Sequence, residues 1–122
     1  MVKERNYSMV DFEGANLKEA NLKRANLVGV DLIKADLTWA NLEGASLKWA
    51  DRTDASLIEA NLEGANFDGV DITGANLKEA NLREAHYLTF DQLSKVKTLH
   101  DAKLDEKLLN SLRKEHVRLF KK

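Results

Sequence analysis

The residues Ala15-Asn16-Leu17-Lys18-Glu19 and Ala20-Asn21-Leu22-Lys23-Arg24 are two successive copies of one five-residue unit. The unit occurs sixteen times without an insertion across residues 10–87, with Ala or Val at every residue number divisible by five. Leu, Phe, Ile or Tyr follows two residues later in every unit except the one that contains Arg52. This repeat decides the fold.

A five-residue period fits neither an α-helix nor a straight strand. A helix turns about 100° per residue, so equivalent residues of successive units form no apolar stripe. In a straight strand, an odd period sends alternate units to opposite faces. The chain must therefore turn in every unit. We expect a short strand with the Ala and Leu positions inward and Asn or Asp outward, followed by a two-residue corner.

Glycine occurs only at the second corner residue, where a positive φ favours it. These glycines are Gly14, Gly29, Gly44, Gly64, Gly69 and Gly74.

A second period of twenty residues predicts the number of sides. The Val residues that replace Ala are separated by multiples of twenty, and an Asp follows each one: Val10, Val30 and Val70. The aspartates at 11, 31, 51 and 71 then form one column, with neighbours about 4.8 Å apart. Four units therefore complete one square coil, and sixteen units make four coils.

These units resemble those of the pentapeptide-repeat family, whose fold is a right-handed quadrilateral β-helix. The resemblance implies that the Leu and Ala positions point inward and that the Asn or Asp positions support the turns. We expect a short N-terminal lead-in at residues 1–9, the β-solenoid at residues 10–87, and a C-terminal helical cap at residues 88–122.

After Tyr87 the apolar spacing becomes helical. Thr89 and Gln92 predict a capping box, followed by a helix with Phe90, Leu93 and Val96 on its apolar side. Asp105 is placed to cap a second helix, whose apolar residues are Leu108, Leu112, His116 and Phe120. Repeat arrays need capping units over their open ends, and these helices also resemble the C-terminal segment of some bacterial family members.

Composition excludes several classes of function. The 122 residues contain no Cys, so disulfides and thiolate metal sites are absent. No apolar run is long enough for a signal peptide or a membrane span, and we expect a cytoplasmic protein. His86, His100 and His116 show no spacing typical of a catalytic or metal site. We expect no enzyme activity, no cofactor and no metal, and we interpret the Asp column as turn support.

The balance of charge differs between the repeat region and the C-terminal segment. Residues 1–87 hold 10 basic and 15 acidic residues, whereas residues 88–122 hold 9 and 5. The resemblance also implies an alternative function, because some family members mimic DNA and inhibit or protect DNA gyrase. A DNA rod of about 20 Å would carry about twelve charges, more than twice the net charge of the solenoid. Direct nucleic-acid binding is not expected.

Two tryptophans occupy outward corner positions. Trp39 is expected beside Ile58 of the next coil, with Ile33 round the corner, and Trp49 beside Val28 of the previous coil. Exposed Trp is enriched at binding hot spots. The sequence therefore favours a scaffold or protein-interaction module that binds a protein partner, without naming the partner.

Two further expectations concern the interior and the first coil. Arg52 is the one polar residue among sixteen inward centres, and we expect a local distortion that brings its guanidinium to solvent or to Asp51 or Asp54. The first coil has little chain before it, and an uncovered strand edge invites pairing. We expect a homodimer through this N-terminal coil.

Overall fold

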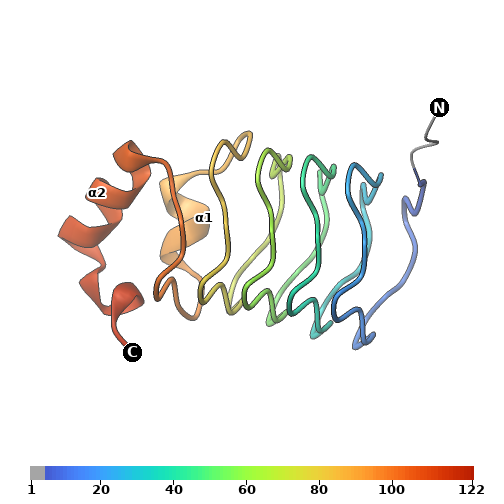
Figure 1. Ribbon diagram of the computed structural model, residues 1–122, viewed down its shortest axis with the longest axis horizontal. Helices are drawn as coiled ribbons and strands as arrows, with labels where there is room; N and C mark the ends of the chain where they lie inside the picture. The colour runs from blue at the N-terminus through green and yellow to red at the C-terminus, as the bar shows by residue number, and fades with distance from the viewer. Residues whose placement is uncertain (1–4) are drawn as a thin grey trace.

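The computed structural model describes residues 5–122, so the first four residues of the predicted lead-in lie outside the described part. The chain winds into a stack of four-sided coils, and the helical segments lie together at the C-terminal end (Figure 1). These segments are α1 (Phe90–Ser94), α2 (Glu106–Glu115) and the 3₁₀ helix η1 (Val117–Phe120).

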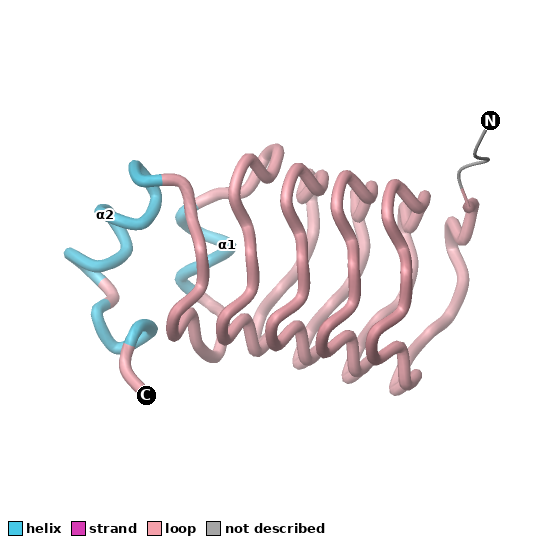
Figure 2. The backbone as a smooth tube through the Cα atoms, in the orientation of Figure 1, coloured by secondary structure: helices cyan, strands magenta, loops and turns pink. Residues whose placement is uncertain are grey.

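Backbone pairing between coils fixes the number of sides at four. Residues twenty apart form parallel bridges, from Asn6 with Asn26 to Asn66 with His86. The N–H of Leu22, for example, donates to the carbonyl oxygen of Asn41 at 2.8 Å. Each bridge joins single residues, so Figure 2 draws the coils as loops. The predicted twenty-residue coil is confirmed.

The second corner residue adopts a left-handed conformation in every coil. Its φ lies between 55° and 73° at all sixteen corners from Met9 to Glu84, although Gly occupies only six of them. A non-Gly residue in this conformation costs about 1–2 kcal/mol. Ten corners therefore carry backbone strain that the rest of the coil must offset.

The Asn and Asp side chains stabilise these corners. Oδ1 of Asn21 accepts a hydrogen bond from the N–H of Lys23 at 3.2 Å, which closes the turn from outside. The same bond forms at fourteen of the described units, and the residues that accept it are Asn6, Asp11, Asn16, Asn21, Asn26, Asp31, Asp36, Asn41, Asp51, Asn61, Asn66, Asp71, Asn76 and Asn81. The turn-supporting role implied by the resemblance is confirmed.

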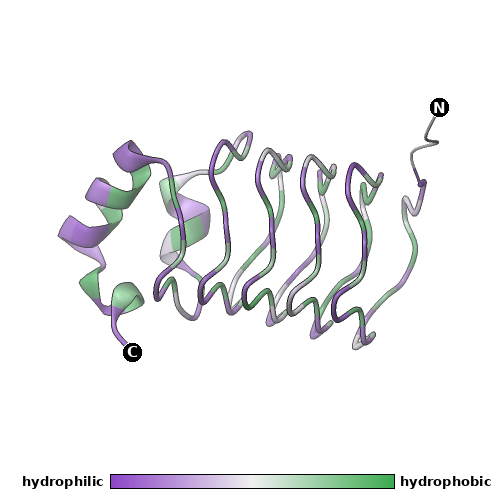
Figure 3. Ribbon diagram, viewed as in Figure 1, coloured by the Kyte–Doolittle hydropathy of each residue, from purple (hydrophilic) through white to green (hydrophobic). Residues whose placement is uncertain are grey.

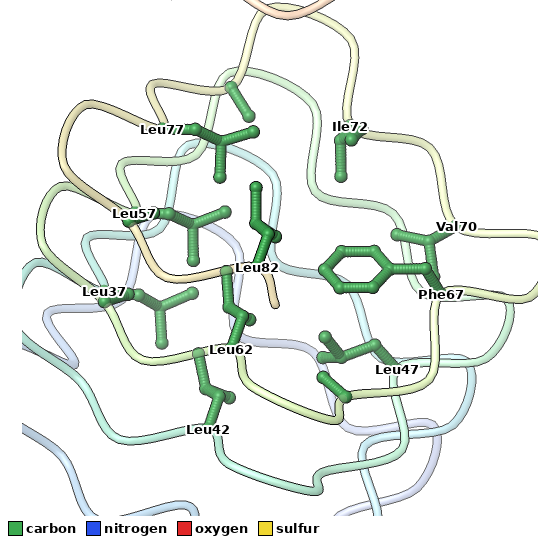
Figure 4. Close-up of a cluster of buried hydrophobic side chains, with 14 of the residues drawn as sticks. Leu37, Leu42, Leu47, Leu57, Leu62, Phe67, Val70, Ile72, Leu77 and Leu82 are labelled. Atoms are coloured by element: carbon green, nitrogen blue, oxygen red, sulfur yellow. The ribbon is translucent and has the colours of Figure 1, made fainter. Parts of the chain in front are cut away.

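The core is a set of side-chain columns along the inside of the stack. Hydrophobic and hydrophilic residues alternate along each coil (Figure 3), and the hydrophobic ones at the Ala and Leu positions of residues 25–82 are buried. Leu37, Leu57 and Leu77 lie above one another, and a second column of leucines stands beside them (Figure 4). These three leucines are completely buried. Because equivalent residues repeat every coil, each one packs on near-copies of itself.

The ladder extends beyond the predicted solenoid at both ends. Asn6 already pairs with Asn26, and its Oδ1 accepts from the N–H of Ser8, so residues 5–9 form a further unit. At the other end, Thr98 and Lys103 bridge residues 76 and 81, an offset of twenty-two instead of twenty. The extra length accommodates α1, which replaces one side of the last coil.

Helix α1 is held by the predicted capping box. The N–H of Gln92 donates to Oγ1 of Thr89 at 3.2 Å, and the N–H of Thr89 donates to Oε1 of Gln92 at 2.8 Å. Nε2 of Gln92 also donates to the carbonyl oxygens of Phe67 and Val70, at 2.9 and 3.0 Å. One side chain thus caps the helix and satisfies two backbone groups of the last full coil.

Helix α2 differs from the sequence prediction in two respects. Asp105 stands at its N-cap position, but its carboxylate accepts from the N–H of Glu84 and not from its own helix. The helix ends at Glu115 and η1 follows, so Leu119 is buried in place of the predicted Phe120. The carboxylate of Asp105 thus ties the start of α2 to the last full coil.

Arg52 contradicts the expectation of a local distortion. Its side chain is completely buried, and Nε, Nη1 and Nη2 have no hydrogen-bond partner among residues 5–122. The backbone stays regular, since the N–H of Arg52 donates to the carbonyl oxygen of Asp71 at 2.8 Å. Burial lowers the pKa of Arg52 to about 9. A bulge at Arg52 would break backbone hydrogen bonds to both neighbouring coils. The structure keeps these bonds and leaves one guanidinium without solvent.

The cap should contribute measurably to stability. Leu112→Ala removes a fully buried side chain and is expected to lower the free energy of unfolding by about 2–5 kcal/mol. Val117→Ala is the matched control, because Val117 is 54% exposed, and it should change stability by less than about 0.5 kcal/mol. Urea unfolding measures both values, and equal effects would contradict the packing described for α2.

Arg52→Leu should stabilise the protein. Replacing an unpaired buried cation with an apolar residue of the same column is expected to raise the free energy of unfolding by about 1–4 kcal/mol. Thermal and urea unfolding at pH 7 measure the change. Arg24→Leu removes the same charge from an exposed corner and serves as the control. A loss of stability in Arg52→Leu would show that the guanidinium is needed where it lies.

The advantage of Arg52→Leu should depend on pH. Below about pH 9 the arginine is protonated in both the folded and the unfolded chain, so the folded protein bears the full cost of burying the charge. Above that pH the folded form loses its proton first, and the cost of burial falls as pH rises towards the ordinary pKa of arginine. The difference in Tm between variant and wild type should be constant from about pH 6 to 8 and smaller at about pH 10.5. A constant difference throughout would contradict the lowered pKa.

Candidate functional site

One corner of the stack carries an exposed apolar column. Met9, Gly29, Trp49 and Gly69 occupy the same corner in four successive coils, and we call them the Trp49 edge. The side chains of Met9 and Trp49 are 77% and 63% exposed. Ladder hydrogen bonds hold the backbone of this edge, as the N–H of Trp49 donates to the carbonyl oxygen of Asp68 at 2.9 Å.

The glycines of this edge make room for the large side chains. A Cβ on Gly69 would lie 2.6 Å from Cδ1 of Trp49, and a Cβ on Gly29 would collide with the sulfur of Met9. Each large side chain therefore lies flat over the glycine of the next coil. The alternation of large residue and glycine gives the edge its apolar surface without bulk projecting from it.

A cation and a carboxylate flank the indole of Trp49. Nζ of Lys48 stands 4.4 Å from the ring centroid and 3.8 Å from Oδ2 of Asp68. A cation over an exposed aromatic face contributes about 0.5–1 kcal/mol. Lys48 thus covers one face of the indole ring, and the other atoms of the ring remain accessible to solvent.

Tyr87 extends the apolar surface beyond the last full coil. Its side chain is 69% exposed, and it lines a depression of about 470 Å³ together with Gly69, Gln92 and Lys95. The repeat places Tyr87 among the inward unit centres, but its side chain is exposed, and the repeat gives no sign that Met9 is a surface residue by its type alone. For Met9 the signal is the register, which residues 9, 29, 49 and 69 share.

Trp39 is more firmly tied to the surface than Trp49. Its Nε1 donates to Oε2 of Glu59 at 2.7 Å, and its backbone N–H donates to the carbonyl oxygen of Ile58. The side chain is 54% exposed, and Ile33 and Ile58 are half-buried. The structure places Trp39 next to Ile58, as the sequence suggested, and on the corner opposite Trp49.

The indole of Trp49 leans towards the next coil, where its Cδ1 would lie 2.6 Å from a Cβ on Gly69. Val28 lines a separate depression of about 520 Å³ with Arg24, Asn26 and Ser46. Side chains at the second corner position lean towards the residue twenty positions later, as Met9 does over Gly29 and Trp49 over Gly69. The predicted pairing of Trp49 with Val28 assumed the opposite direction.

The carboxylates of the Asp column accept hydrogen bonds within their own turns. Oδ1 of Asp71 accepts from the N–H of Thr73 at 3.0 Å, and this backbone hydrogen bond is the main cause that lowers the pKa of its carboxyl. Asp31 accepts from the N–H of Ile33 in the same way. Among residues 5–122, no group of three or more His, Asp or Glu side chains is placed to hold a metal ion.

Comparison with known proteins agrees with this architecture. The model of the pentapeptide repeats family matches residues 10–51 and 53–86 in eight copies, and the gap between the two ranges is Arg52. No curated protein matches the chain. In the described part of the chain, no helix has the length and apolar character needed to cross a bilayer.

Solved structures of similar proteins include a pentapeptide repeat protein from the thylakoid lumen of Arabidopsis thaliana. It is 29% identical, the alignment covers 90% of this chain and 75% of that one, and the TM-score is 0.52. Rfr23 from the cyanobacterium Cyanothece 51142 is 26% identical over 87% of this chain and 64% of that one, with a TM-score of 0.45.

QnrB1, a plasmid-mediated fluoroquinolone resistance protein, is 18% identical over 89% of this chain and 64% of that one, with a TM-score of 0.46. The family match spans more than half of the 122 residues, and the four-sided coils agree with it. The repeat that organises this chain is therefore the family's own, and the chain belongs to the pentapeptide repeat family, whose fold is a right-handed quadrilateral β-helix.

Proposed function

We propose that this protein is a non-enzymatic scaffold that binds a partner protein through the Trp49 edge. The observation that carries the proposal is the exposure of Trp49 and Met9 in one column, each lying flat on a glycine. Tryptophan is enriched among residues that dominate binding energies, because it buries a large area at little entropic cost. The ladder keeps this surface rigid, which lowers the entropy lost on binding.

Trp39 is the weaker candidate of the two tryptophans. Its indole N–H is already satisfied by Glu59, and Glu19 and Glu59 occupy the same corner in the neighbouring coils. A partner would have to desolvate these carboxylates to reach the ring. The Trp49 edge presents glycines at the equivalent positions, so it can be covered at a lower cost.

Surface charge does not favour the DNA-mimic alternative. Lysines of the solenoid lie close to carboxylates of the next coil, with Nζ of Lys18 3.7 Å from Asp36 and Nζ of Lys23 3.7 Å from Glu43. Lys48 and Asp68 repeat the arrangement. A mimic of the DNA backbone would need rows of unpaired negative charge.

The experiment that tests the proposal places a photo-crosslinking amino acid at position 49, with position 39 as the matched control. The partner captured through position 49 in cells is then purified and its affinity measured. Trp49→Ala should weaken binding at least about tenfold, the loss expected for a hot-spot residue, whereas Trp39→Ala should change it less than about threefold. Equal effects of the two substitutions would overturn the assignment to the Trp49 edge.

We also propose a homodimer through the first coil. Val10 is 38% exposed and Phe12 is half-buried, whereas the equivalent Val30 and Leu32 of the second coil are buried. Within residues 5–122, the N–H of Asp11 has no backbone acceptor, although the equivalent N–H of Asp31 donates to Val10. Such an edge can pair with a second copy about a two-fold axis.

Light scattering should show a dimer at micromolar concentrations, and Phe12→Lys should convert it to a monomer because a charge would enter the contact. Phe90→Lys, at the opposite end of the stack, is the control and should leave the dimer intact. A wild-type monomer at high concentration would count against this proposal.

A further inference from the structure

Three segments meet in a basic depression at the C-terminal end of the stack. Its volume is about 530 Å³, and Lys78 of the last full coil lies on one side of it. Lys97, Thr98 and His100 come from the segment that continues the ladder after α1. Arg118, Lys121 and Lys122 come from η1 and the residues after it.

Hydrogen bonds hold the three segments together. The N–H of Leu99 donates to the carbonyl oxygen of Leu119 at 2.6 Å, and Oγ1 of Thr98 donates to the same oxygen at 3.2 Å. Nδ1 of His100 lies 3.2 Å from the carbonyl oxygen of Phe120, which can only accept. The leucine side chains at 99 and 119 are completely buried beneath. The depression is therefore a fixed part of the cap.

The cations of this depression lack the carboxylate partners that three lysines of the solenoid have. Lys18, Lys23 and Lys48 each lie within 4 Å of a carboxylate of the next coil. In the described part of the chain, neither Lys78 nor any of the four other Lys and Arg side chains around the depression forms such a pair. The residue after Lys78 in its column is His100, because α1 shifts the register by two.

Acidic groups stand near the depression but not in its lining. Oδ2 of Asp101 lies 3.2 Å from Nε2 of His100, and Glu79 is joined to His100 through a backbone hydrogen bond of 2.8 Å. Both residues occupy the second corner position. Asp101 is engaged with the imidazole of His100, and the side chains of five Lys and Arg residues line the depression.

We propose that this depression binds a small phosphate-type anion that carries several negative charges. A guanidinium binds two oxygens of one phosphate group, and ammonium groups supply positive charge in any orientation. No Phe, Tyr or Trp lines the space, so cationic side chains dominate the recognition of a ligand there. The acidic solenoid next to it repels a long polyanion, which restricts the ligand to one that fits the depression.

Tripolyphosphate is the probe for the first experiment. Isothermal titration at about 0.15 M salt compares wild type with two double variants that lose the same charge, Lys78→Gln with Arg118→Gln, and Lys34→Gln with Lys107→Gln. All four side chains are exposed, and circular dichroism and Tm check the fold. We expect binding by wild type and by the second double variant, and a loss of at least about tenfold in the first.

Two further measurements locate the site and identify its chemistry. Amide NMR shifts on titration should be largest at Thr98, His100 and Leu119. Citrate, at equal ionic strength, should bind at least about tenfold more weakly than tripolyphosphate. The proposal is overturned by equal affinities of the two double variants, by citrate binding as tightly as tripolyphosphate, or by no detectable binding of tripolyphosphate by wild type.

Discussion

Parallel pairing of each residue with the one twenty positions later is the constraint on which the rest of this structure depends. It fixes four sides, aligns the side chains in columns and places every outward residue opposite its equivalent in the next coil. Strain at ten left-handed non-Gly corners is tolerated because the ladder and the Asn and Asp turn bonds act on the same few residues. No single corner can relax without loss of hydrogen bonds to two neighbouring coils.

Arg52 shows how strong this constraint is. A buried guanidinium without a partner is among the most unfavourable groups that an apolar core can contain. The chain nevertheless keeps the regular pairing with Asp71 at this position. Other unit centres are apolar, and the family match is interrupted at this one residue. The fold thus accommodates a defect in one column because the neighbouring coils keep their regular pairing around it.

The arithmetic of the repeat predicts the fold, because five and twenty residues have one simple geometric solution. It also predicts the corner position of both tryptophans. It does not predict which way a corner side chain leans, and so Trp49 covers Gly69 instead of Val28. Sequence spacing likewise predicts that Asp105 caps its own helix. Its carboxylate instead accepts from the N–H of Glu84, twenty-one residues away. The basic depression could not be foreseen, since it depends on the two-residue shift that α1 introduces between residues 76 and 98.

The uniform offset of the ladder also has a consequence for the order in which the chain folds. Every bridge closes a loop of twenty or twenty-two residues, so each new coil costs nearly the same chain entropy once its neighbour exists. Only the first coil to form lacks a template. In an array of this kind, folding can begin at any coil and spread from neighbour to neighbour. The five-residue α1 and the ten-residue α2 are too short to be stable alone, so they gain their order from the coil beneath them.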